Sequence, residues 1–321
     1  VQKGGFYWAG AYVCRDYVLV GTDDGKSGYT SKTANVLLLD PMSGKLLDSM
    51  TGFAGDIRST ICYDEATNAF YFDSKGSYFY RMRVQKDTDG AWRLTDRAEL
   101  PIGGMSTSTP VIANGRAYIG VCGSGQFTEY SGHSITVIDL SGAMSIAYRA
   151  DTQGYPQTSG LLTTGYDNYN YIYFLDNYTP GTLRVLRDKE GQTKADYTTL
   201  ERVGEGKTEQ TYTTAYALFT PAGEQAQYCI CSPIVDENGT LYFKNDSGYL
   251  MAYEAGDKFD TTGLKVTATY ANGVTRDVTK LMKMKDADKS LTAEDKSVTL
   301  VYCKGQTMYH NQQNTQDNTM K

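Results

Sequence analysis

One pattern recurs along the chain and constrains its fold more than any other feature. A short apolar strand and a turn lead to an aromatic-rich strand; a polar loop then leads to a third strand, a turn and a fourth strand. The aromatic-rich strands are Val18–Val20, Phe70–Phe72, Ala117–Ile119, Ile172–Phe174 and Leu241–Phe243. Their last residues are 52, 47, 55 and 69 positions apart. Self-similarity at such a period is typical of a repeat architecture.

The connections between the expected strands have the chemistry of tight β turns. Ala113–Gly115 and Asp236–Gly239 join first to second strands, whereas Asp40–Lys45 and Asp87–Gly90 join third to fourth strands. Asn-Gly and Asp-Gly pairs supply the positive φ that hairpins need. Four short strands per unit, repeated about every 40–55 residues, predict an all-β fold made of β-propeller blades.

Five such blades are recognisable between Trp8 and about Glu254, and the region from about 199 to 227 is expected to be a long insertion after the fourth. The composition agrees with strands and turns, because 27 tyrosines and 33 glycines stand against 7 prolines in 321 residues. Hydrophobic residues make up 40% of the chain and charged residues 21%, so the chain can bury a sizeable core.

Charge and cysteine content narrow the possible partners. The net charge of −6 argues against a nucleic-acid surface, and no apolar stretch is long enough to span a membrane. The six cysteines are scattered, and we expect mainly free, buried thiols, because Cys62 aligns with Val111 and Ile234 at one strand position. Cys229 and Cys231 lie two apart, but without a neighbouring histidine they are a weak metal signal.

Several segments carry a family resemblance. Leu37–Lys45 resembles the LD-x-x-[ST]-G-K core of the PQQ-like propeller repeat, Gly239–Leu250 is similar, and the resemblance covers positions 8–254 loosely. Three further stretches resemble a surface-protein branch of that family in Gram-positive bacteria: Gly103–Pro110, Gly132–Leu140 and Gln153–Thr163. The resemblance implies an extracellular protein on the bacterial cell surface, in which neighbouring modules of a longer protein flank the propeller.

The C-terminal region resembles a bacterial Ig-like module. Gly256–Tyr270 is similar to the start of such a module, and Ala271–Thr279 follows its Y-x-[DN]-G-x-x-x-D-V-T hairpin. Leu291–Tyr302 alternates like a closing strand, but too few residues separate Tyr253 from Gly256 to hold the module's first strand. We therefore expect a propeller over 1–255, a partial Ig-like module over 256–303 and a polar tail over 304–321, mobile from His310 onward.

Two cofactors are relevant to this sequence, PQQ and calcium. Quinoprotein dehydrogenases share this propeller type and depend on repeated tryptophans, but this chain has only Trp8 and Trp92 and no adjacent Cys-Cys, so we expect no PQQ. The Asp23-Asp24-Gly25 run offers carboxylates that calcium accepts, but it does not continue into an EF-hand loop. Turn formation is the preferred interpretation, and calcium at Asp23 and Asp24 is the weaker alternative.

Propeller geometry predicts where a site would lie. The segments that lead into the first strands and the loops between second and third strands emerge on one face, and here they mix aromatic with polar groups, which suits sugars or peptides. The candidate ligand-binding residues are Trp8, Arg58, Tyr155, Gln157, Tyr228, Lys75, Tyr130, His133, Asp176 and Lys244. The alternative is that the hydroxyls of this face only satisfy backbone groups around a wet channel: Ser59, Thr60, Ser108, Thr109, Ser159 and Ser232.

Two classes of function remain. The first is a non-catalytic binding, adhesion or scaffold module that holds a glycan, peptide or protein on the loop face. The second is a propeller-type glycoside hydrolase or lyase, which needs two carboxylates about 5–10 Å apart. The segments leading into the first strands carry Ser and Thr rather than Asp or Glu, so we favour binding and assign no catalytic residue.

Overall fold

The computed structural model describes residues 4–123, 132–165, 168–196, 198–203, 210–254, 267–269, 273–278, 282–284, 297–304 and 307–314. The chain divides into two units, one comprising Val1–Val235 with Tyr242–Ala252 and the other Asp236–Leu241 with Tyr253–Lys321. Within the described residues the only helical element is the 3-10 turn η1, Gly223–Gln225. No helix there has the length and apolar character to cross a membrane.

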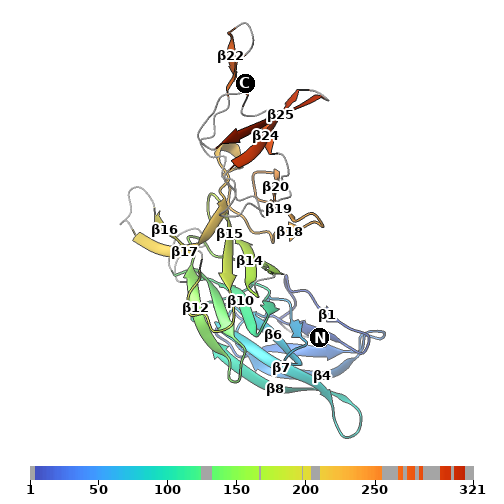
Figure 1. The fold of residues 1–321 in the computed structure, drawn as a ribbon. Coiled ribbons are helices and arrows are strands. Elements are labelled where there is room, and N and C mark those ends of the chain that lie inside the picture. The colour runs from blue at the N-terminus through green and yellow to red at the C-terminus, as the bar shows by residue number, and fades with distance from the viewer. Residues whose placement is uncertain are drawn as a thin grey trace. The chain divides into compact units, whose positions relative to one another are not determined.

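The first two blades are four-stranded antiparallel sheets whose strands pair in chain order (Figure 1). The first contains β1 (Tyr12–Val13), β2 (Val18–Gly21), β3 (Ala34–Leu39) and β4 (Leu46–Phe53). The second contains β5 (Cys62–Asp64), β6 (Ala69–Ser74), β7 (Tyr78–Lys86) and β8 (Trp92–Pro101). Cys62 opens β5, as its alignment with Val111 predicts.

The third and fourth blades follow the same order. The third contains β9 (Val111–Ala113), β10 (Arg116–Val121), β11 (Ser134–Asp139) and β12 (Ser145–Asp151). The fourth contains β13 (Leu161–Thr164), β14 (Asn170–Leu175), β15 (Leu183–Asp188) and β17 (Gln210–Phe219). Strand β17 also pairs with β16 (Thr198–Val203) and, in parallel, with β12, so the two blades share one nine-stranded sheet.

The predicted insertion is therefore partly wrong. Its residues form the β16–β17 hairpin, and β17 is the fourth strand of the fourth blade rather than an addition to it. The reason is length, because β17 has ten residues and reaches beyond its pairing with β15.

The remaining sheets are smaller. Three strands form the fifth blade within the described residues: β18 (Ile234–Val235), β19 (Thr240–Lys244) and β20 (Leu250–Glu254). Further along are the hairpin β21 (Thr267–Thr269) with β22 (Thr275–Asp277), and a sheet of β23 (Met282–Met284), β24 (Ser297–Lys304) and β25 (Thr307–Asn314). Residues 307–314, expected in the polar tail, pair with β24 along their whole length. Much of the expected Ig-like module lies outside the described residues.

The repeats predict the strands well. The five aromatic-rich segments are the second strands β2, β6, β10, β14 and β19, and all four named turns join the strands they were expected to join. Asn114 and Gly115 have φ of 50° and 72°, as the Asn-Gly hairpin requires. The all-β, blade-repeat architecture of a propeller is confirmed.

Alternation along each second strand builds the core between blades. Phe70 and Phe72 pack toward the first blade in a cluster with Leu19 and Val36. Tyr71, between them in sequence, packs instead in the cluster that the third blade contributes to. Since successive strand residues point to opposite faces, one aromatic-rich strand supplies both neighbouring interfaces.

Candidate functional site

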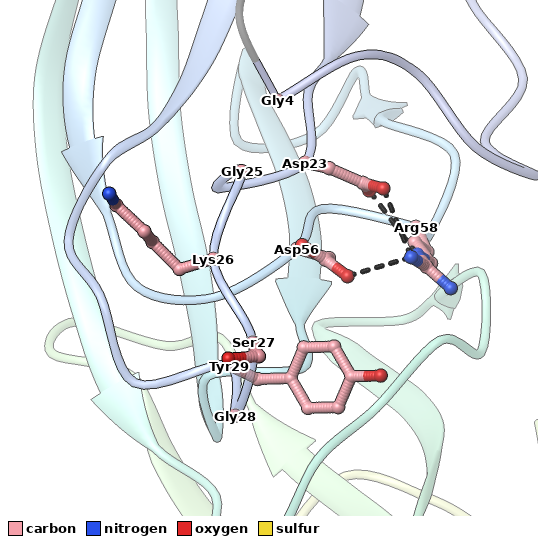
Figure 2. A pocket seen from close by; sticks show the side chains of 9 residues that line it. All are labelled: Gly4, Asp23, Gly25, Lys26, Ser27, Gly28, Tyr29, Asp56 and Arg58. Atoms are coloured by element: carbon pink, nitrogen blue, oxygen red, sulfur yellow. Dashed lines mark hydrogen bonds and ion pairs between the residues drawn. The ribbon is translucent and has the colours of Figure 1, made fainter.

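Loops of the first two blades converge on a pocket of about 280 Å³ (Figure 2). The β2–β3 loop and the segment leading into β5 supply most of its lining, which is Gly4, Asp23, Gly25, Lys26, Ser27, Gly28, Tyr29, Asp56 and Arg58. These are the two kinds of segment that propeller geometry predicts on one face. The pocket lies wholly within the first unit.

Arg58 contacts two carboxylates of this pocket, those of Asp23 and Asp56 (Figure 2). Its Nε donates to Asp23 Oδ1 at 3.2 Å and its Nη2 to Asp23 Oδ2 at 3.0 Å. The same Nη2 is 2.8 Å from Asp56 Oδ2. Burial alone would lower the pKa of Arg58, but the hydrogen bond and charge of Asp23 and the charge of Asp56 outweigh it and raise that pKa. Arg58 is thus a permanent cation shared by two aspartates.

Asp24 is hydrogen-bonded to two residues that line the pocket. Its backbone N–H donates to Asp56 Oδ1 at 3.1 Å, and its own Oδ1 accepts the backbone N–H of Lys26 at 2.7 Å. Its other carboxylate oxygen is buried without a hydrogen-bond partner. Burial, followed by the nearby charge of Asp56, raises the pKa of Asp24 although the Lys26 bond opposes this.

Arg58 is bonded to Asp23, one of the two carboxylates considered for calcium. Asp23 already has Arg58 as a bidentate partner, and in the described ranges no three His, Cys, Asp or Glu side chains are grouped to hold a metal ion. The geometry therefore assigns Asp23 and Asp24 to the arginine and to the backbone of the loop.

Two exposed rings cover the arginine. Arg58 Cζ is 4.8 Å from the ring centroid of Tyr7 and 5.1 Å from that of Trp8. Tyr7 is 56% exposed and Trp8 67% exposed. Trp8 has a φ of 62°, a left-handed conformation that a bulky residue adopts only where its surroundings enforce it. The backbone N–H of Asp23 donates to Gly5 O at 3.0 Å and so ties this aromatic segment to the β2–β3 loop.

Lys75 joins the same region from the β6–β7 loop. Its Nζ is 3.4 Å from the ring centroid of Tyr29, and its backbone N–H donates to Asp56 O at 2.9 Å. Three of the predicted ligand-binding residues, Trp8, Arg58 and Lys75, therefore lie together around this pocket.

Other predicted residues are packed inside the loops. The hydroxyl of Tyr155, which is 1% exposed, accepts the backbone N–H of Thr107 at 2.7 Å, and burial raises its pKa. Gln157 Oε1 accepts Asn177 Nδ2 at 3.2 Å. The Tyr155 contact joins the segments that lead into the third and fourth blades, and the Gln157 contact lies within the fourth. Tyr155 therefore supports the face from within rather than presenting its ring to solvent.

His133 and Asp176 are also fully enclosed. His133 Nδ1 accepts the backbone N–H of Gly123 at 2.9 Å. Asp176 Oδ2 is 3.7 Å from Arg184 Nε, and both side chains are almost inaccessible. Charges of this kind are retained when they are paired, and this pair holds the β14–β15 loop.

Two further predicted residues lie near the fifth blade. Tyr228 is partly exposed, and its hydrogen bond to Asp246 raises its pKa. Lys244 is exposed at the end of β19. Tyr130 lies outside the described residues.

The alternative role for the hydroxyls of the loop face is observed for most of them. Ser59 Oγ donates to Asp73 O at 2.9 Å, Ser108 Oγ to Thr158 O at 2.9 Å, and Ser159 Oγ to Thr109 O at 3.0 Å. Thr60 N donates to Thr109 Oγ1 at 3.0 Å. The Ser59 bond lies within the second blade, and the other three bonds tie one blade to the next through backbone groups.

Sequence reasoning missed Asp56, Tyr7 and Tyr29. Asp56 carried a usable signal, because it stands two residues before Arg58 in the same leading segment. Tyr7 and Tyr29 had none, because their place depends on how the first residues and the β2–β3 loop fold over the arginine.

Comparison with known proteins shows only distant likeness. No family model matches the chain, and none of the curated proteins matches it. Among solved structures, the chain is similar to Chaetomium thermophilum Sqt1 at 10% identity and a TM-score of 0.47, over 92% of this chain and 79% of that one.

Two further similar structures are the β-propeller domain of Myceliophteria thermophila Cps50 (Swd1) and a europium-containing methanol dehydrogenase. The first has 10% identity and a TM-score of 0.42 over 95% and 86% of the two chains. The second has 10% identity and a TM-score of 0.43 over 92% of this chain and 56% of that one. The blade architecture is evident from strand order and register without these similarities.

Proposed function

We propose that this chain is a non-catalytic extracellular binding module that holds a glycan, or a peptide or protein segment of similar polarity, at the Arg58 pocket. One observation carries the proposal: two exposed aromatic rings, Tyr7 and Trp8, lie over an arginine that two aspartates fix in place, at the edge of an open pocket.

The chemistry of the pocket suits a sugar. A pyranose offers an apolar face that stacks on an exposed ring and hydroxyls that donate to carboxylates, so it needs both kinds of group in one place. Asp23 and Asp56 supply the acceptors, and their shared bond to Arg58 fixes their orientation before a ligand arrives.

An extracellular location is supported by the resemblance of the repeats to bacterial surface proteins. Labelling intact cells of the source organism with a membrane-impermeant amine reagent tests it. Labelled chain in intact cells is the expected result, and labelling only after lysis would contradict it.

A glycoside hydrolase is the second candidate, because Asp23 and Asp56 both bind the same nitrogen of Arg58 and so lie as close as paired glycosidase carboxylates do, within about 10 Å. The arginine argues against it. Its Nη2 is within 3.0 Å of both carboxylates, so a charged nitrogen rather than a scissile bond is their shared partner.

The test is a glycan and peptide array with the purified chain and two pocket variants. Trp8→Ala removes an exposed ring without opening the core, and Arg58→Lys keeps the charge but loses the bidentate geometry. Loss of one stacking contact is worth about 1.4 kcal/mol, so Trp8→Ala should weaken binding about tenfold. Tyr216→Ala is the matched control, since that ring is 48% exposed on β17 away from the pocket.

Three outcomes decide between the candidates. Retention of a ligand that Trp8→Ala weakens and Tyr216→Ala does not supports the module and its site. Retention unaffected by both pocket variants would remove the site. Turnover of any arrayed sugar would reverse the choice in favour of the hydrolase.

A further inference from the structure

The thiols of Cys229 and Cys231 lie side by side just before β18. Their sulfurs are 3.7 Å apart, and both lie close to one carbonyl oxygen, Lys244 O, at 3.1 Å from Cys229 Sγ and 2.9 Å from Cys231 Sγ. The backbone N–H of Lys244 in turn donates to Cys231 Sγ at 3.3 Å. The sequence spacing would place the two side chains on one face of a strand; here they converge although neither residue is in a strand.

The backbone around this pair is held from several sides. Thr158 Oγ1 donates to Cys231 O at 3.1 Å, and Asn245 Nδ2 donates to Gln227 O at 3.1 Å. Gly181 lies so close that a Cβ on it would be 2.7 Å from Cys229 Cβ. Side-chain rotation is therefore the motion left to the two sulfurs.

The two thiols differ in access and in acidity. Cys229 is 1% exposed, whereas Cys231 is partly exposed. The hydrogen bond from Cys229, followed by the backbone N–H and the charge of Lys244, lowers the pKa of Cys231 to about 6, while the pKa of Cys229 is raised. By contrast, burial raises the pKa of Cys62 to about 12 and that of Cys122 to about 11.

We propose that Cys229 and Cys231 form a redox-active dithiol that reduces low-molecular-mass disulfides and closes to a Cys229–Cys231 disulfide. The proposal rests on two sulfurs already within 3.7 Å, with one thiol open to a reagent and its partner buried directly behind it. A disulfide needs the sulfurs at about 2.05 Å, which is a short approach for two side chains on a fixed backbone.

The exchange balances in two steps. The Cys231 thiolate attacks one sulfur of the disulfide R–S–S–R. A bond forms between Cys231 Sγ and that sulfur, the S–S bond of the reagent breaks, and RS⁻ leaves. The Cys229 thiol then loses its proton to RS⁻ and attacks Cys231 Sγ, which releases the second RS⁻. The protein dithiol is oxidised by two electrons and the reagent is reduced to two thiols.

Metal binding fits the pair less well. Beside these two sulfurs, the described part of the chain brings no further His, Cys, Asp or Glu side chain into a group that could hold an ion. Two thiolates fill only half of the four positions around a tetrahedral metal ion. Two thiols are sufficient for thiol–disulfide exchange.

The test incubates the fully reduced chain with oxidised glutathione, quenches with acid, alkylates the remaining thiols and maps every cysteine by mass spectrometry. We expect Cys229 and Cys231 to become linked without a retained glutathione, since the buried thiol displaces it. Cys229→Ser should stop at a stable glutathione adduct on Cys231. Cys231→Ser should react at least tenfold more slowly, and Cys122→Ser, which alters a cysteine outside the pair, should behave as the unmodified chain does.

A second measurement needs no variant. Limiting iodoacetamide at pH 7 should alkylate Cys231 before Cys14, Cys62, Cys122 or Cys229. Earlier alkylation of any of those four would overturn the proposal, and so would an adduct that stays on Cys231 of the unmodified chain. The proposed glycan-binding pocket and the cysteine pair share no residue. Failure of one proposal therefore leaves the other standing.

Discussion

Two arginine–aspartate clusters among the described residues have similar composition and opposite surroundings. The pocket cluster comprises Tyr7, Trp8, Asp23, Asp56 and Arg58, and its rings are more than half exposed. The interblade cluster comprises Arg116, Tyr118, Tyr148, Asn170 and Asp188, and its members are at most 9% exposed. The same side-chain types therefore serve two different ends.

The difference follows from the elements that carry each cluster. The interblade residues stand on strands β10, β12, β14 and β15, whose side chains face a neighbouring blade. Asp188 accepts the hydroxyls of Tyr118 at 2.7 Å and Tyr148 at 2.8 Å, and Arg116 Nε is 3.9 Å away. The pocket residues stand on loops, where a face is left for a ligand. Residue type alone does not distinguish a binding site from a structural network.

Removing the centre of the interblade cluster should have the largest effect. Asp188→Ala leaves two buried tyrosine hydroxyls without an acceptor and Arg116 without its counter-ion, so we expect the free energy of unfolding to fall by about 3–5 kcal/mol. Guanidinium denaturation measures it. Asp196→Ala is the control, because its ion pair with Arg187 is partly exposed and should be worth less than about 1 kcal/mol. Equal losses from both variants would show that the interblade cluster is not special.

A graded effect should follow when single hydroxyls are removed. The Tyr118 hydroxyl donates to Asp188 and also accepts a hydrogen bond from Asn170 Nδ2 at 2.8 Å. The Tyr148 hydroxyl donates to Asp188. Tyr118→Phe should therefore cost about 2–3 kcal/mol and Tyr148→Phe about 1 kcal/mol. Thermal unfolding of both variants checks the order. The reverse order would mean that packing, not hydrogen bonding, decides the cost.

The buried carboxyl of Asp73 should make the stability of the fold depend on pH. Its side chain is 0% exposed, both carboxylate oxygens lack a hydrogen-bond partner, and burial raises its pKa well above the usual range. The nearby hydroxyls of Ser59 and Ser106 donate to backbone carbonyls, so they offset this only in part. The folded chain thus holds a proton that the unfolded chain releases at about pH 4.

The raised pKa of Asp73 determines how the free energy of unfolding changes with pH. Between the unfolded and the raised folded pKa of Asp73, the folded state binds one more proton, so stability falls as pH rises by up to about 1.4 kcal/mol per pH unit. Asp73→Asn removes this contribution. We expect the stability of the variant minus that of the unmodified chain to grow between pH 4 and 7, measured by urea denaturation. A constant difference would mean that Asp73 ionises normally in the fold.

The strands were predictable and the site only in part, for reasons visible in particular residues. Alternation such as Phe70-Tyr71-Phe72 encodes a strand locally, and Asn114-Gly115 encodes its turn. Arg58 and Trp8 could be placed on one face because that follows from blade topology. The burial of Tyr155 and His133 could not, because it depends on which neighbouring loop covers them.

The smallest effect on stability should come from the ring most important to the proposed function. Trp8 is 67% exposed, so Trp8→Gly loses little buried area, and the loss of its contact with Arg58 costs about 0.5–1 kcal/mol. Its φ of 62° is a conformation that glycine adopts freely, and relief of that strain offsets about the same amount. Denaturation should therefore shift by no more than about 0.5 kcal/mol while glycan retention falls about tenfold. A loss of stability above about 1 kcal/mol would show that Trp8 holds the fold together, and the pocket cluster would then resemble the interblade cluster in purpose as well as in composition.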